Sequence, residues 1–222
     1  MNDLPFVKSI SSINVCQIMK LTAVLQEHKE ISITSPTCFK QVFAIEYTNC
    51  LVFHSPDLER KVQKKISRRF LSQREKWLGC LYAKDMLLGC QIQLTIAWIN
   101  QKVGYGVFAN QEIARNTCIG EYTGLIRKRS WFEGDNNIYC FEYHILEYKR
   151  SPYVIDARSM GNHTRFINHS TEPNIDSVLA YHQEKRHIIL YANKEIHKGS
   201  QLCYDYGPNY WKNRGPFIQF NC

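Results

Sequence analysis

The sequence predicts an α+β fold that is mainly β, with a smaller helix-containing region at its N-terminal end. After about residue 90 the chain runs through short stretches of β-forming residues, each four to nine residues long and separated by turn residues. Before that point, Ser55, Pro56 and Asp57 provide an N-cap, a first-turn proline and a first-turn acid, which predict the start of a helix. Strands and helices do not alternate regularly, which argues against a doubly wound nucleotide-binding fold.

The individual elements follow from the same patterns. Residues 42–53 predict one or two strands. A helix is expected from residue 56 to a stop near Gly89, with an apolar face made by Val62, Ile66, Phe70, Trp77 and Leu81. The strands predicted in the second half span residues 91–99, 103–108, 117–122, 138–145, 153–156, 177–181, 188–192 and 201–206.

The charge of the chain favours an acidic partner. The 222 residues have a formal net charge of +8, and the excess lies mainly in residues 1–93, which carry 13 basic and 8 acidic side chains. Either a solvated helix face or a docking surface for nucleic acid explains the basic cluster on the predicted helix. Its members are Arg60, Lys61, Lys64, Lys65, Arg68 and Arg69.

The cysteine pattern and the hydropathy of the chain indicate the kind of cellular compartment in which the protein resides. The nine cysteines include no CxxC pair, and several lie in apolar runs, which is typical of reduced, buried thiols. A reducing compartment is therefore expected. The first residues do not have the pattern of a signal peptide, and no stretch approaches 18 apolar residues, so we expect a soluble protein without a membrane partner.

Three segments carry polar groups of chemical interest, and each has a structural alternative. Residues 104–106, a glycine pair around Tyr105, fit a hairpin turn or a close approach of backbone to a ligand. Asn168 and His169 follow an apolar pair and fit a hydrogen-bonded structural cluster or a ligand contact. Tyr204 and Tyr206, on one face of a predicted strand, fit core packing or the wall of an apolar slot.

Taken together and in order, four segments resemble a SET domain, the family of protein-lysine methyltransferases. They are residues 104–106, 120–124, 161–170 and 202–207. Within the family the chain is most similar to the compact SET proteins of chlamydial-type bacteria. The resemblance implies a β-clip of short, pseudoknotted sheets over residues 91–207, an N-terminal region of unknown role over residues 1–90, and a C-terminal segment over residues 208–222.

The resemblance also implies the site. It makes Tyr206 and Tyr204 the catalytic residues, with Tyr204 limiting the product to one or two methyl groups. It implies binding of S-adenosyl-L-methionine by Gly104, Tyr105, Gly106, Arg165, Phe166, Asn168, His169, Tyr206 and Trp211. The lysine channel is expected to be lined by Tyr139, Tyr143 and Tyr204. No metal is expected, because Thr171 stands where many relatives have a zinc-binding cysteine and only Cys222 follows Gly207.

The implied function is transfer of methyl groups from S-adenosylmethionine to lysine side chains of histone or histone-like proteins. A catalytically silent binding module and a nucleic-acid or chromatin-docking protein are the alternatives. A basic substrate would need a local acidic groove, expected from Glu142, Glu147, Asp176 and Glu184. The resemblance places the protein in the bacterial cytoplasm, with delivery to a host cell nucleus as a further destination. The oligomeric state, a homodimer included, and the target lysine stay open.

Overall fold

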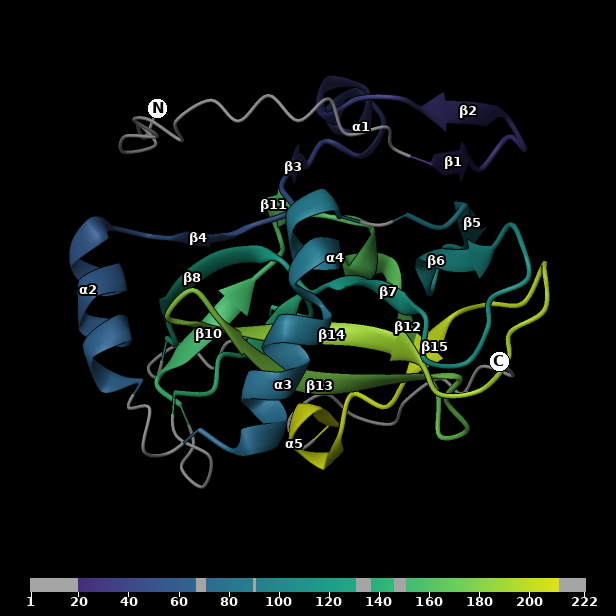
Figure 1. Cartoon of the computed structure of the whole chain (residues 1–222). Coiled ribbons are helices and arrows are strands. Elements are labelled where there is room, and N and C mark those ends of the chain that lie inside the picture. Colours follow the sequence, from purple (N-terminus) through teal and green to yellow (C-terminus); the bar gives the residue numbers. More distant parts are fainter. Residues whose placement is uncertain (1–19, 67–70, 90, 131–136, 146–150, 212–222) are drawn as a thin grey trace, which may run out of the picture.

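The structure is a computed structural model that describes residues 20–66, 71–89, 91–130, 137–145 and 151–211. Its architecture is a set of small sheets with short helices on the outside (Figure 1), which confirms the mainly β class. The strands are β1 Leu21–Val24, β2 Glu30–Ile33, β3 Glu46–Tyr47, β4 Leu51–Phe53, β5 Leu94–Asn100, β6 Gly104–Ala109, β7 Cys118–Glu121, β8 Gly124–Lys128, β9 Cys140–Glu142, β10 Tyr153–Asp156, β11 Met160–Gly161, β12 Asn168–His169, β13 Ile175–His182, β14 Lys185–Ala192 and β15 Cys203–Tyr204.

The sheets join distant parts of the sequence. Two of them have four strands each, in the orders β2-β1-β5-β6 and β4-β8-β10-β9, and a third has the order β13-β14-β7. Two-stranded sheets pair β11 with β3 and β12 with β15. The strands from the N-terminal region are inserted into this framework, since β1 runs parallel to β5, β4 to β8 and β3 to β11. The region before residue 90 therefore contributes to three of the sheets of the described chain.

The described helices are α1 Pro36–Phe43, α2 Pro56–Lys65, α3 Gln73–Leu81, α4 Ala83–Leu88, the 3₁₀ helix η2 His163–Phe166 and α5 Pro208–Trp211. Four of them, α1, α2, α3 and η2, begin at a residue whose side chain caps them. The predicted start of α2 is confirmed, because the Ser55 hydroxyl accepts from the Leu58 N–H at 3.2 Å. Gly89, with φ of 72°, is the C-cap of α4, which confirms the helix end expected near this residue.

The single helix expected from residue 56 to residue 89 is wrong. A second helix starts at a capping box, in which the Glu75 N–H donates to the Ser72 hydroxyl at 3.1 Å and the Ser72 N–H donates to the Glu75 carboxylate at 2.8 Å. Because α3 has its own orientation, its buried face differs from the predicted one. Trp77 and Leu81 are 62% and 50% exposed, while Val62 and Ile66 on the first segment are buried as expected. Phe70 lies outside the described residues.

The strand predictions fared better than the helix prediction. Each run predicted after residue 90 contains a strand, whereas Val42 and Phe43, predicted as strand, close helix α1. Five described cysteines, Cys38, Cys50, Cys80, Cys118 and Cys140, are thiols outside any disulfide, as expected. The expected burial is wrong for them, because Cys50 and Cys80 are exposed and the other three are half-buried. Cys203 differs from the expected reduced state because it is disulfide-bonded. In the described part of the chain, the helices are too short and too polar to cross a membrane.

Candidate active site

The site is built where β12 and β15, far apart in the sequence, lie side by side in parallel. Asn168 pairs with Cys203 and His169 with Tyr204. Two hydrogen bonds extend the crossing, because the Ser170 N–H donates to the Tyr204 carbonyl at 3.2 Å and the Tyr206 N–H donates to His169 Nδ1 at 3.2 Å. Burial lowers the pKa of His169, opposed by Asp205, so the ring is neutral at pH 7 and Nδ1 can accept this hydrogen bond. The crossing thus holds the two polar segments of the sequence at one place.

A cavity of about 770 Å³ opens beside this crossing. It brings together ten of the residues that the sequence singles out for the site: Gly104, Tyr105, Tyr139, Arg165, Phe166, Asn168, His169, Tyr204, Tyr206 and Trp211. Two of the singled-out residues, Gly106 and Tyr143, do not line it. The cavity is large enough for a cofactor and part of a substrate, since small-molecule sites usually span roughly 300–1,000 Å³.

Aromatic rings and one well-placed hydroxyl form the floor of the cavity. The Tyr206 hydroxyl donates to the Ile167 carbonyl at 2.7 Å. The rings of Tyr204 and Tyr206 lie 4.7 Å apart, and Trp211 stacks on Tyr206 with an interplanar angle of 10°. Burial raises the pKa of Tyr204 and of Tyr206 well above the ordinary phenol value, with further increments from neighbouring tyrosines. Both groups are therefore neutral phenols at physiological pH.

Glycine is favoured at positions 104 and 106 for two different structural reasons. Gly104 has φ of 79° at the turn between β5 and β6, which favours glycine. A Cβ on Gly106 would lie 2.6 Å from Ile99 Cδ1 and 3.1 Å from the side-chain amide of Asn168. That amide donates to the Tyr105 carbonyl at 3.2 Å. The hairpin explanation thus holds for Gly104, and Gly106 allows β6 to approach Asn168 closely.

Arg165 places a cation in the cavity wall. The residue is only 8% exposed, its guanidinium lies 3.7 Å from the centre of the Tyr139 ring, and Nε donates to the Ala157 carbonyl at 2.6 Å. Burial lowers the pKa of Arg165, although a guanidinium stays charged at physiological pH. In the described residues no carboxylate lies within ion-pair distance of it. Arg165 is therefore available to an anionic group of a ligand.

The predicted channel wall needs a correction. Tyr143 is 1% exposed and lies in the core against Phe53, with its hydroxyl accepting from the Arg186 N–H at 3.3 Å. The short edge strand β9 instead directs Phe141 into the cavity, where it stacks on Tyr204 at 6.2 Å. Tyr122 also lines the cavity and donates to the Tyr139 carbonyl at 2.9 Å. Both were missed, although Phe141 lies in the same predicted strand, residues 138–145, as Tyr139 and Tyr143.

The acidic groove expected for a basic substrate is not present among the described residues. Glu142 lines the cavity but accepts from Arg129 at 3.2 Å and from the Ser151 N–H at 2.7 Å. Asp176 and Glu184 do not line it, and Glu147 lies outside the described residues. The lining is instead mainly cationic, with Lys102, Arg129, Arg158 and Arg165.

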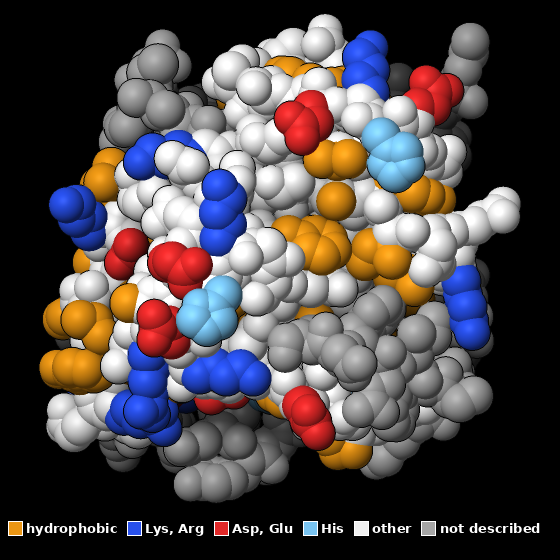
Figure 2. All heavy atoms as spheres, turned by 90° about the vertical axis from the view of Figure 1, so that its right-hand side faces the viewer, with side chains coloured by type: hydrophobic (Ala, Val, Ile, Leu, Met, Phe, Trp, Pro, Cys, Tyr) orange, Lys and Arg blue, Asp and Glu red, His pale blue; other side chains and the backbone are white. Residues whose placement is uncertain are grey.

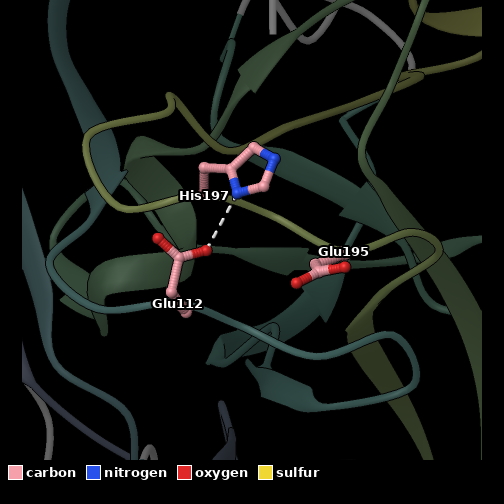
Figure 3. A group of neighbouring side chains, drawn as sticks. All are labelled: Glu112, Glu195 and His197. Atoms are coloured by element: carbon pink, nitrogen blue, oxygen red, sulfur yellow. Dashed lines mark hydrogen bonds and ion pairs between the residues drawn. The ribbon is translucent and has the colours of Figure 1, made fainter.

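Charges elsewhere on the surface are mixed. Figure 2 shows the face on the right of Figure 1, where hydrophobic side chains gather at the centre and charges of both signs surround them. One cluster of metal-type side chains stands out in the described chain, formed by Glu112, Glu195 and His197 (Figure 3). All three are exposed, and His197 Nδ1 lies 3.0 Å from Glu112, which also accepts from the Lys198 N–H at 3.0 Å. These contacts describe a surface ion pair outside the cavity.

Comparisons with known proteins agree with this geometry. Residues 104–207 match the model of the SET domain family. Mouse histone-lysine N-methyltransferase EHMT1 is 36% identical over 128 residues, which make up 55% of this chain and 10% of that protein. Histone-lysine N-methyltransferase SUV39H2 of Gallus gallus is 30% identical over 129 residues, or 53% of this chain and 31% of that protein.

The fold is shared more widely than these segments. The crystal structure of ATXR5 in complex with histone H3.1 matches with a TM-score of 0.59 at 21% identity, covering 81% of this chain and 88% of the other. The chain spans about a third or less of the length of the curated relatives that it matches. Residues 104–207 therefore form a SET domain, homologous to histone-lysine methyltransferases over that part of the chain.

Proposed function

We propose that this protein transfers methyl groups from S-adenosylmethionine to lysine side chains of a protein substrate. One observation carries the proposal: the β12–β15 crossing holds the Tyr206 hydroxyl on the Ile167 carbonyl, in the wall of a cavity that is lined mainly by residues of the SET domain. The homology of residues 104–207 to histone-lysine methyltransferases supports it. Histone or histone-like proteins are the proposed substrates for the same reason.

The residues present fit S-adenosylmethionine. Aromatic rings of Trp98, Tyr105 and Phe166 form one apolar wall, with ring centres 5.2 Å and 5.7 Å apart around Tyr105. The Arg165 guanidinium can meet the carboxylate of the cofactor, because no carboxylate of the described chain occupies it. The proposed binding residues are Gly104, Tyr105, Gly106, Arg165, Phe166, Asn168, His169, Tyr206 and Trp211. When bound, the cofactor supplies a methyl group on a positively charged sulfur.

The protein's own residues prepare the lysine. A free lysine has a pKa of about 10.4, so the amine must lose a proton before it can attack. Burial among Tyr204, Tyr206 and Phe141 disfavours the charged amine, and so do the nearby cations, Arg165 among them. Because the Tyr206 proton is engaged with the Ile167 carbonyl, the phenol oxygen presents its lone pairs to the amine and orients it.

We further propose that the protein belongs to the compact chlamydial-type branch and acts on chromatin as a bacterial effector. The sequence resemblance, which includes residues 206–211, supports this branch. In the structure, α5 in this segment packs by ring contacts. Trp211 lies 4.9 Å from the His169 ring and Tyr210 lies 4.6 Å from the Tyr206 ring. The sites of action proposed are the bacterial cytoplasm and, after delivery, the host nucleus.

The test is a transfer assay with labelled S-adenosylmethionine, eukaryotic core histones and bacterial histone-like protein. We expect label on lysine and a loss of roughly 10²-fold or more in Tyr206→Phe, because the orienting oxygen is removed. Tyr47→Phe is the matched control, since its hydroxyl bonds Asn49 at 2.6 Å outside the cavity. Cofactor binding without label on any substrate would favour a silent binding module.

A second function is nucleic-acid docking through α2. The helix buries Leu58 and Val62, whereas Arg60, Lys61, Lys64 and Lys65 are exposed. Arg60 is paired with Asp57, whereas Arg68 and Arg69 lie outside the described residues. Charge reversal at Lys64 and Lys65 should abolish a salt-dependent affinity for DNA. Reversal of the exposed Lys194 and Lys198 should not, and an unchanged affinity in both variants would exclude α2 as the docking site.

A further inference from the structure

Helix α3 is apolar on two sides, which is unusual for a helix at a protein surface. Its inner side packs on the sheet of β13 and β14, where Leu78 and Tyr82 join Met86 of α4, Ala180 and Ile189 in one buried cluster. The packing is close, because a Cβ on Gly79 would lie 1.8 Å from the Tyr181 carbonyl oxygen. The inner side therefore accounts for only part of the apolar residues of α3 and α4.

The outer side exposes large hydrophobic side chains. Trp77 and Leu81 on α3 are 62% and 50% exposed, and Leu87 on α4 is 62% exposed. In the described part of the chain, these are three of the four large hydrophobic residues that stand out as exposed, the fourth being Ile138 at the cavity. Exposed hydrophobic residues are normally scattered singly, so the presence of three of them on two consecutive helices marks an interaction surface.

A groove beside this face adds charges of both signs. It has a volume of about 530 Å³ and is lined by Trp77 and Leu81 together with Arg74 and Asp85. Neither Arg74 nor Asp85 has an ion-pair partner among the described residues. Burial raises the pKa of the Asp85 carboxyl, opposed by a backbone hydrogen bond and by the neighbouring Lys84. The surface thus offers an apolar centre with one cation and one anion, and neither charge is in an ion pair within the described chain.

We propose that this α3–α4 face is a homodimer interface between two copies of the chain, related by a twofold axis. In a twofold interface the same patch occurs on both sides, so residue i of one copy meets residue j of the other and the reverse. Arg74 then meets the partner subunit's Asp85, and Asp85 meets the partner subunit's Arg74. Trp77, Leu81 and Leu87 of both copies bury one another at the centre.

The self-complementary charges favour a second copy over an unrelated partner. A groove that held only cations would call for an acidic protein, and one that held only acids would call for a basic one. Here one copy provides the counter-charge for each side chain of the other, so both Arg74 and Asp85 gain an ion-pair partner in one step. The interface lies on α3 and α4, whose residues do not line the cavity of the SET domain, so the inference is independent of the proposed activity.

The first experiment measures the mass of the full chain in solution by sedimentation equilibrium. The wild type should be a dimer at concentrations on the order of 100 µM. Arg74→Asp and Asp85→Arg should each weaken the dimer by roughly tenfold or more, because each places like charges opposite one another twice. The matched control is Lys198→Asp, which reverses an exposed charge outside the groove and should leave the mass unchanged.

The decisive experiment is to mix the two charge-reversal variants. An equimolar mixture of Arg74→Asp and Asp85→Arg should form a heterodimer, because each contact then joins opposite charges again. Neither unfolding nor a surface elsewhere would produce this recovery, and the Trp77→Ser variant should stay monomeric in every mixture. A monomeric wild type, a dimer that the single variants leave intact, or a mixture that stays monomeric would each overturn the proposal.

Discussion

The regions before and after residue 90 have different structural roles. Residues 20–89 add β1, β3 and β4 to sheets of the later region, and their helices pack against those sheets from outside. Residues 91–211 supply most of the cavity wall, including its tyrosines, Asn168, His169 and Arg165. Chemistry fixes the identity of a residue, whereas packing fixes only its size and polarity. The later region therefore carries motifs that indicate a function, and the earlier one carries only local helix-capping motifs.

One buried ion pair joins the two regions. The Arg186 guanidinium of β14 is 3.0 Å from the Glu75 carboxylate of α3, and the side chains are 1% and 8% exposed. A buried pair costs much desolvation, and the loss of one partner leaves the other charge buried without it. A single substitution at the Glu75–Arg186 pair should therefore weaken the contact between the two regions most strongly.

The largest effect is expected from Glu75→Gln. The amide can still accept from the Ser72 N–H, so the cap of α3 survives while the charge opposite Arg186 is lost. We expect the free energy of unfolding to fall by about 3–5 kcal/mol in urea titrations. Glu46→Gln, which breaks an exposed pair with Lys40, should cost about 1 kcal/mol or less. Equal losses of unfolding free energy in the two variants would contradict a special role of the Glu75–Arg186 pair between the two regions.

Low pH should lower the folding stability mainly through a residue of the region after residue 90. His163 is fully buried, its Nε2 donates to the Ile119 carbonyl at 3.0 Å, and burial lowers its pKa from 6.5 to about 4. The unfolded chain binds this proton more readily than the folded one, so stability should fall as the pH drops from about 6.5 to about 4.

Unfolding midpoints measured across that range check the effect. His163→Gln should flatten the slope, because no proton is then taken up at this position on unfolding. His54→Gln should leave the slope as in the wild type, because His54 is exposed in the earlier region. A slope that persists in His163→Gln would assign the acid sensitivity to another group.

Gly79→Ala tests the contact of α3 with β13. Alanine favours a helix over glycine by up to about 1 kcal/mol, so an exposed site would be stabilised. Here the added Cβ would overlap the Tyr181 carbonyl oxygen, and we expect a net loss of about 1–3 kcal/mol in thermal or urea unfolding. A stabilised variant would show that α3 does not pack on β13 as described.

The smallest expected effect is a change of product in Tyr204→Phe. Tyr204 stacks on Phe141 and contacts Tyr206, so its hydroxyl occupies space in the cavity wall next to the proposed amine position. Its removal should shift the product from mono- and dimethyl-lysine toward higher states, while total transfer changes by only about twofold. Mass spectra with the same product distribution for both proteins would refute this role.

The sequence predicted more of the later region than of the earlier one for physical reasons. Its strand runs and the order of its motifs identify the fold, and ten of the predicted site residues line one cavity. By contrast, β12 and β15 are two residues long, so their parallel pairing follows from distant packing and not from local periodicity. Spacing alone put Trp77 on the buried face, although the Ser72 and Glu75 capping box was a readable signal for a new helix.

The most direct test of the account compares two tryptophans, one from each region, by calorimetric titration of the full chain with S-adenosylhomocysteine. Trp211 lines the cavity and stacks on Tyr206, whereas Trp77 is exposed on α3. We predict that Trp211→Ala weakens binding by roughly tenfold or more and that Trp77→Ala leaves it unchanged. A wild type that does not bind, or equal effects of the two substitutions, would contradict the assignment of the cavity as the cofactor site.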